Sequence, residues 1–142
     1  RLRILMAIIG GAGNPVGGSF TGPSQQFEIV GDYGYSYSGS VAVPNTPTDL
    51  NSFTTGNFYT VAKWYPGYAA ESGDNMQFRI FFNDSQIYQT TLDSRLVGSP
   101  YQWIELIIPP YTEVLVNCEN KSSSSGISVT SNITGRIYRT RD

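Results

Sequence analysis

The fold class is decided by residues 76–92, which read MQFRIFFNDSQIYQTTL. In the first half, Met76, Phe78, Ile80 and Phe82 alternate with Gln77, Arg79 and Phe81, a period of two that is typical of a strand with one buried face. Asn83-Asp84 then predicts a tight turn, and residues 85–92 form the return strand of a hairpin. Because Arg79 points away from Phe78 and Ile80, we expect it on the outer face of a sheet.

The same β pattern continues on both sides of this hairpin. Short runs rich in β-branched and aromatic residues are separated by Pro and Gly turns, and no stretch of a dozen residues has a helical period. Eight or nine short strands are expected, over residues 27–30, 33–43, 50–54, 58–64, 76–82, 85–92, 103–108, 112–119 and 127–138. This pattern predicts an all-β fold, an antiparallel β-sandwich, and the length fits a single eight-stranded jelly roll.

The N-terminal region differs from the rest of the chain. Residues 10–26 hold six glycines and two prolines, a composition that predicts an extended connector. We therefore divide the chain into an extended Gly-rich N-terminal arm, residues 1–26, and a jelly-roll domain, residues 27–142. The arm begins with an apolar segment that we expect to dock on a neighbouring subunit by strand addition, through Leu2, Ile4, Leu5, Met6, Ile8 and Ile9. The alternative is an edge strand of the same domain.

The composition excludes several kinds of catalytic and metal-binding site. The chain has no His and one Cys, which excludes His-based catalytic triads, His-ligated zinc and an intrachain disulfide. A net charge of -2 without a basic block argues against nucleic-acid and membrane partners. Charged residues make up 14% of the chain, against about 25% in an average domain. Such a surface suits extensive protein contacts, and it is equally typical of a neutral extracellular-type surface. The lone Cys118 falls on an apolar strand face and is expected in the core.

Three other sets of residues are candidate sites. Glu105 with Glu113 or Glu119 could form the paired carboxylates of a glycosidase, but solvated surface charges are the simpler interpretation. Residues 71–75 offer oxygen atoms without the full spacing of a calcium loop. Residues 10–13, Gly-Gly-Ala-Gly, lack the Lys-Ser/Thr of a phosphate-binding loop. The sequence thus predicts no catalytic residue, no metal site and no cofactor.

Aromatic residues are the remaining candidates. Tyr33, Tyr35 and Tyr37 form a stripe on one strand face, which is interpreted as core in preference to an exposed stacking surface. The aromatics expected to make surface contacts are Trp64, Tyr65 and Tyr68, which flank the loop after residue 65.

Three phrases carry a family resemblance: EIVGDYGYSYSG at residues 28–39, IIPPYTEV at 107–114 and TGRIY at 134–138. Together they resemble small β-rich virion proteins of double-stranded DNA viruses, especially tailed phages, over about residues 27–138. The resemblance implies a non-enzymatic capsid decoration, cement or minor capsid jelly roll, located in the virion. Its partners would be the major capsid protein, other virion proteins and copies of itself in trimers or pentamers.

The alternative function is a carbohydrate- or receptor-binding β-sandwich, either on a spike or as a lectin-like module. That alternative requires a solvent-exposed platform of Tyr or Trp side chains, which a structure can reveal.

Overall fold

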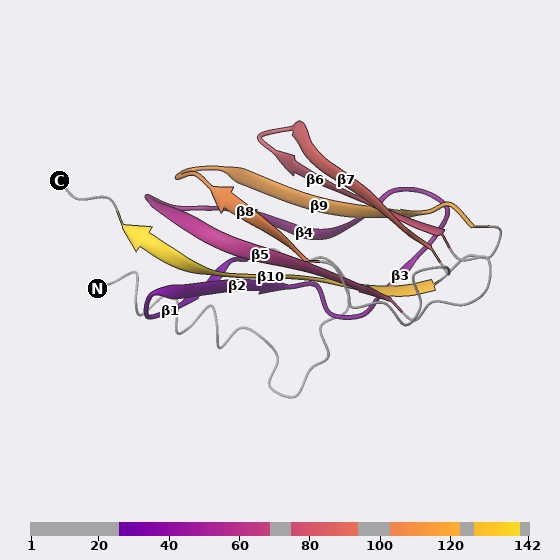
Figure 1. The fold of residues 1–142 in the computed structure, drawn as a ribbon, viewed down its shortest axis with the longest axis horizontal. Coiled ribbons are helices and arrows are strands. Elements are labelled where there is room, and N and C mark those ends of the chain that lie inside the picture. Colours follow the sequence, from indigo (N-terminus) through magenta and orange to yellow (C-terminus); the bar gives the residue numbers. More distant parts are fainter. Residues whose placement is uncertain (1–25, 69–74, 94–102, 123–126, 140–142) are drawn as a thin grey trace.

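The computed structural model describes residues 26–68, 75–93, 103–122 and 127–139, and the regular elements in these ranges are ten β-strands (Figure 1). The six-stranded sheet contains β1 (Glu28–Val30), β2 (Tyr33–Tyr37), β3 (Val41–Val43), β5 (Phe58–Tyr68), β8 (Ile104–Ile108) and β10 (Ile127–Arg139). The four-stranded sheet contains β4 (Thr48–Thr54), β6 (Asn75–Phe82), β7 (Ser85–Asp93) and β9 (Glu113–Asn120). Within these ranges, no helix is long and apolar enough to cross a membrane.

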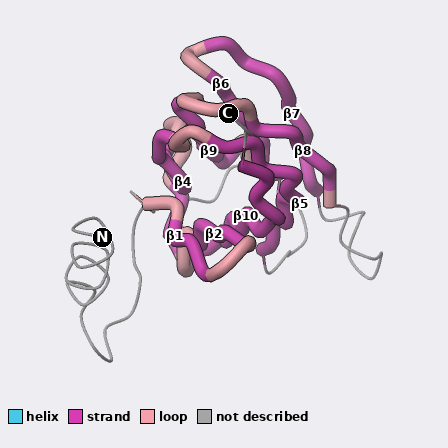
Figure 2. Tube along the Cα trace, turned by 90° about the vertical axis from the view of Figure 1, so that its left-hand side faces the viewer, coloured by secondary structure: helices cyan, strands magenta, loops and turns pink. Residues whose placement is uncertain are grey.

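The strand pairing is that of a jelly roll. The chain pairs as one long hairpin, β2 with β10, β4 with β9, β5 with β8 and β6 with β7, all antiparallel. This hairpin is rolled up so that β10 also pairs with β5, and β9 also pairs with β6. Two layers result, with orders β1-β2-β10-β5-β8 and β4-β9-β6-β7 (Figure 2). The predicted antiparallel sandwich and jelly roll are confirmed. The structure differs in two details: β1 is an additional strand beside β2, and β2 and β3 pair with different parts of β10.

The core lies between the two sheets and is filled from alternate positions on their strands. Trp64 from the six-stranded sheet meets Phe78 from the four-stranded sheet edge-on, with ring centroids 5.5 Å apart. Around this pair lie fully buried aliphatic side chains such as Leu50, Ile80 and Ile133. Cys118 is also fully buried, as predicted, and its burial raises the pKa of the thiol to about 12.

A buried polar network joins the sheets where β2 and β3 are separated. Asn51 of β4 is fully buried and donates its amide N–H groups to Ser36 Oγ at 3.1 Å and to the carbonyl of Ser131 at 3.2 Å. The Ser131 hydroxyl donates to Asn51 Oδ1 and accepts the indole N–H of Trp64 at 2.8 Å. The backbone N–H of Ser38 still donates to the Ser131 carbonyl at 3.0 Å, but the Ser131 N–H donates to Ser38 Oγ at 2.8 Å, so a side chain replaces one of the two backbone bonds here. The single strand expected over residues 33–43 is therefore interrupted.

The β6–β7 hairpin has the predicted tight turn. Asn83 and Asp84 have φ values of 50° and 67°, the left-handed values that a two-residue type I′ turn requires. Asn83 also bonds the start of β9, because its backbone N–H donates to the carbonyl of Glu113 and its Oδ1 accepts the Glu113 N–H, both at 2.9 Å. The turn thus fixes the hairpin against the neighbouring strand.

Candidate binding surface

The outer face of the six-stranded sheet, called here the tyrosine face, gathers most of the exposed large apolar side chains. Of eleven such side chains among the described residues, eight belong to this face by strand alternation, register and ring contacts. They are Val30, Tyr33, Tyr37, Tyr59, Tyr65, Trp103, Ile107 and Tyr138. Such clustering on one face is typical of a binding surface, whereas single exposed apolar residues need no explanation.

A shallow depression, the tyrosine trough, runs along this face over β10. Its volume is about 470 Å³. Tyr33, Tyr35 and Tyr37 of β2 form one wall, Lys63 and Tyr65 of β5 form the other, and Thr134 of β10 lies between them. Thr134 pairs in register with Tyr35 on one side and with Lys63 on the other. Because adjacent strands lie about 4.8 Å apart, the two walls stand on backbones separated by roughly 10 Å.

The cations of the tyrosine face lie over aromatic rings. The Lys63 ammonium is 4.4 Å from the centre of the Trp103 ring. The Arg136 guanidinium lies between two tyrosines, 5.8 Å from the ring centre of Tyr33 and 5.5 Å from that of Tyr138. These cation–π contacts orient both side chains, and among the described residues neither side chain forms an ion pair.

Two glycines that pair in register allow close packing beneath the trough. Gly34 of β2 faces Gly135 of β10 in register, and both positions point toward the core. A Cβ atom at residue 135 would lie 2.6 Å from Ala62 Cα, so β10 approaches β5 more closely than a side chain permits. A Cβ atom at residue 34 would collide with the ring of Phe27, which stacks on Phe53 at 5.0 Å. Phe27 therefore fills the space under the tyrosine wall.

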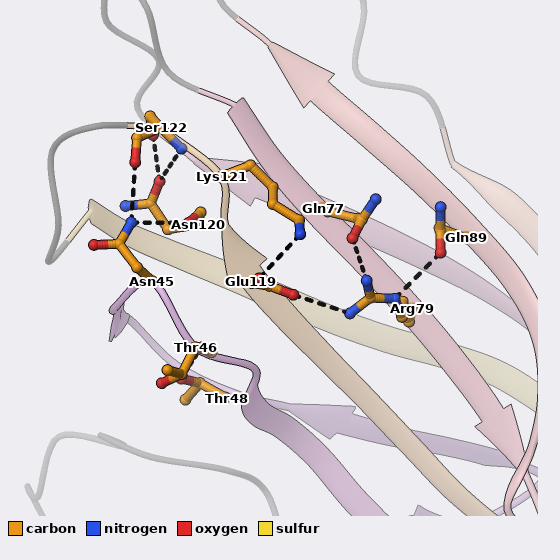
Figure 3. A network of polar contacts seen from close by, with 10 residues as sticks. All are labelled: Asn45, Thr46, Thr48, Gln77, Arg79, Gln89, Glu119, Asn120, Lys121 and Ser122. Atoms are coloured by element: carbon orange, nitrogen blue, oxygen red, sulfur yellow. Dashed lines mark hydrogen bonds and ion pairs between the residues drawn. The ribbon is translucent and has the colours of Figure 1, made fainter.

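The outer face of the four-stranded sheet is different in kind, because it carries hydrogen-bonded polar and charged groups (Figure 3). Arg79 donates to Glu119 at 3.3 Å and to Gln89 at 3.2 Å, and it also bonds Gln77. Lys121 pairs with Glu119 at 3.1 Å. The hydrogen bond from Lys121 is the main cause of a lowered pKa for Glu119. Arg79 lies on the outer face as predicted, and its partners come from its own sheet.

The structure changes the interpretation of the candidate aromatics. Trp64 is 1% exposed, so its prediction as a surface contact is wrong: the indole fills the core and needs Ser131 as acceptor. Tyr65 is exposed on the tyrosine face, and the side chain of Tyr68 lies outside the described residues. The core interpretation of the Tyr33, Tyr35 and Tyr37 stripe is also wrong. The small residues between these tyrosines face inward instead, where they accommodate Phe27 and the Asn51 network.

The carboxylate pairs considered as a glycosidase site do not meet. Glu105 belongs to β8 in the six-stranded sheet, whereas Glu113 and Glu119 belong to β9 in the four-stranded sheet. All three project outward, so the two sheets separate them.

The arm residues Leu2 to Ile9, the segment 10–13 and residues 71–74 lie outside the described residues. Within the described ranges, no group of three or more Cys, Asp or Glu side chains could hold a metal ion.

Comparison with known proteins identifies no family. No family of known proteins and no curated protein matches the chain. Among solved structures, it is similar to dimeric latent PorU from Porphyromonas gingivalis, with a TM-score of 0.31 and 14% sequence identity. The match covers 84% of this chain, which spans 11% of the length of the PorU chain. A likeness this distant carries no argument about function.

Proposed function

We propose that the chain is a non-enzymatic virion structural protein, a capsid decoration or minor capsid jelly roll that binds neighbouring subunits. The observation that carries this proposal is the open edge at β7. Eight-stranded jelly rolls are a recurrent architecture of viral capsid proteins, and the low charge of the chain reduces the cost of covering its surface.

Three of the four sheet edges are protected against pairing with another chain. β1 has only three residues, and β8 has five and is followed by Pro109-Pro110. β4 follows Pro44 and Pro47, and its register shifts between Asp49 and Asn51. Short strands, prolines and bulges are the means by which proteins prevent pairing at an edge.

β7 is the least protected of the four edges, although its register with β6 shifts between Ile80 and Phe81, which leaves Ile87 as an extra residue. It has nine residues, Ser85–Asp93, without Pro, Lys or Arg, and its one charged residue is the terminal Asp93. Among the described residues, its only strand partner is β6. A long uncharged edge presents free backbone N–H and C=O groups to an additional strand. We infer that a strand from a second copy, or from another virion protein, pairs with β7.

A matched pair of substitutions tests this edge. Ile87 of β7 and Ile107 of β8 are both exposed on edge strands, at 45% and 63%, one in each sheet. Lys on an edge strand opposes strand addition, so Ile87→Lys should weaken self-association of the full chain about tenfold or more, a loss of about 1.4 kcal/mol. Ile107→Lys should associate like the wild type in sedimentation velocity.

The proposal also predicts that the chain is present in purified particles of the virus whose genome encodes it. A wild-type chain that is monomeric throughout the micromolar range and absent from those particles would contradict the proposal. Equal loss of association in both variants would show that β7 is not the contact. Urea unfolding of each variant distinguishes lost association from lost folding.

A carbohydrate- or receptor-binding sandwich is the second candidate function. It is favoured by the tyrosine face, because that function needs a solvent-exposed platform of aromatic side chains. The two functions use different surfaces, since β7 belongs to the other sheet. A shell protein held through β7 would leave the tyrosine face free for a ligand.

A further inference from the structure

We propose that the tyrosine trough binds a neutral oligosaccharide whose chain lies along the strands. This inference rests on the second candidate function and names its ligand class and its site. The trough has a volume of about 470 Å³, which is within the range of about 300–1,000 Å³ that small-ligand sites occupy.

The shape of the trough favours a narrow, linear ligand. Its two walls come from β2 and β5, which lie on either side of β10 and run alongside it, so a linear ligand between the walls would follow β10. Roughly 10 Å between the backbones of β2 and β5 leaves room for one chain of sugar rings above Thr134. At one end of the trough, Arg136 lies between Tyr33 and Val61 in the cross-strand register. The opposite end has Tyr37 and Tyr65 on its two sides.

The chemistry of the walls suits a ligand that is apolar on its faces and hydroxylated at its rim, as a pyranose is. Tyr35 and Tyr37 pack against each other with ring centroids 4.7 Å apart, and Tyr37, at 47% exposure, presents aromatic surface for stacking. Across the trough, Tyr65 lies 6.3 Å from Trp103, which extends the opposite wall. Thr134 and Glu105 supply oxygen acceptors, while Lys63 supplies N–H donors.

The charges of the tyrosine face favour an uncharged ligand. Lys63 and Arg136 are balanced by Glu105, which pairs with Lys63 in register, and by Glu28, which pairs with Tyr35. A phosphate or sulfate site would gather cations without carboxylates beside them. Because Lys63 and Arg136 already lie over aromatic rings, their remaining donors are positioned before a ligand arrives.

The test uses the full chain and an array of immobilised neutral oligosaccharides: β-1,4-linked oligomers of glucose and N-acetylglucosamine, and α-linked oligomers of glucose and mannose. Heparin and sialylated glycans serve as charged comparators. We expect binding to at least one neutral class, with an affinity that Tyr35→Ala and Tyr65→Ala each reduce about tenfold or more. Tyr59→Ala is the matched control, since Tyr59 is exposed on the same face and strand as Tyr65 but does not line the trough. It should bind within about twofold of the wild type.

Three results would overturn the inference. One is the absence of binding to every neutral glycan, and another is binding to the charged comparators alone. The third is an equal loss of binding in Tyr59→Ala and Tyr65→Ala. If Tyr65→Ala instead abolishes assembly while no glycan binds, the tyrosine face is a protein interface. The virion proposal is tested separately by Ile87→Lys, so the two can fail independently.

Discussion

Ser131 is the residue on which the buried polar network depends. Its hydroxyl accepts the Trp64 indole N–H at 2.8 Å and donates to Asn51 Oδ1, and all three side chains are at most 1% exposed. Ser131→Ala would leave both partners buried without this bond, so the free energy of unfolding should fall by about 2–4 kcal/mol in urea unfolding. Ser128→Ala, at an exposed position of the same strand, should change it by less than about 0.5 kcal/mol. A small effect at Ser131 would mean that the network does not join the sheets.

Cys118 makes a second prediction at the residue scale. Because burial raises the pKa of its thiol to about 12, the thiol stays protonated and inaccessible in the folded chain. Iodoacetamide at pH 8 should therefore label the native chain far more slowly than the unfolded chain. In the unfolded chain the thiol has its ordinary pKa of 9.0, so its contribution to stability is complete below pH 9 and is lost as the pH rises to about 12. Cys118→Val should lack this part of the alkaline loss, and rapid labelling of the native chain would contradict the buried position.

At the scale of the element, the β6–β7 turn is held in a conformation that its sequence only partly favours. Asp84 has a φ of 67°, and Asn-Gly is the preferred pair for a type I′ turn. We therefore expect Asp84→Gly to raise the free energy of unfolding by about 1 kcal/mol. Asp84→Val should lower it, because a β-branched residue is strained at positive φ. Urea unfolding measures both changes. If Asp84→Gly is less stable than the wild type, the interactions of the Asp84 side chain stabilise the turn by more than its positive φ destabilises it.

Strand periodicity predicted the elements well but could not assign their faces. The alternation at residues 76–82 was sufficient, because its two faces differ clearly in polarity. The face of the Tyr33, Tyr35 and Tyr37 stripe was misassigned because Tyr suits either a buried or an exposed position. The inward residues between them, Gly34 and Ser36, are packed by Phe27 and bonded by Asn51, and both of these partners lie outside the strand itself. Trp64 was misplaced for the same reason. Its acceptor Ser131 lies 67 residues further along the chain.

At the scale of the molecule, the sandwich has two outer faces of opposite character and one open edge. The polar face satisfies its charges internally through Arg79 and Glu119, so it needs no partner. The tyrosine face and β7 offer aromatic surface and free backbone groups. The two proposals use these surfaces separately, because the contact with neighbouring subunits is assigned to β7 and the ligand to the tyrosine face. The sequence alone predicted neither surface, since both depend on which strands the roll places at an edge or outside.

The division of the chain into arm and domain gives the last prediction. Every buried hydrophobic residue in the described ranges lies between Val41 and Ile137, Phe27 packs against this core, and the first strand begins at Glu28. Deleting residues 1–22 should therefore leave the unfolding midpoint in urea within error of the full chain. It should also weaken assembly in sedimentation velocity, because the apolar residues Leu2 to Ile9 would no longer be present to pair with β7. Combining the deletion with Ile87→Lys should give no further loss, since both changes would remove the same contact. Assembly by the shortened chain as strong as that of the full chain would show that a different segment occupies this edge.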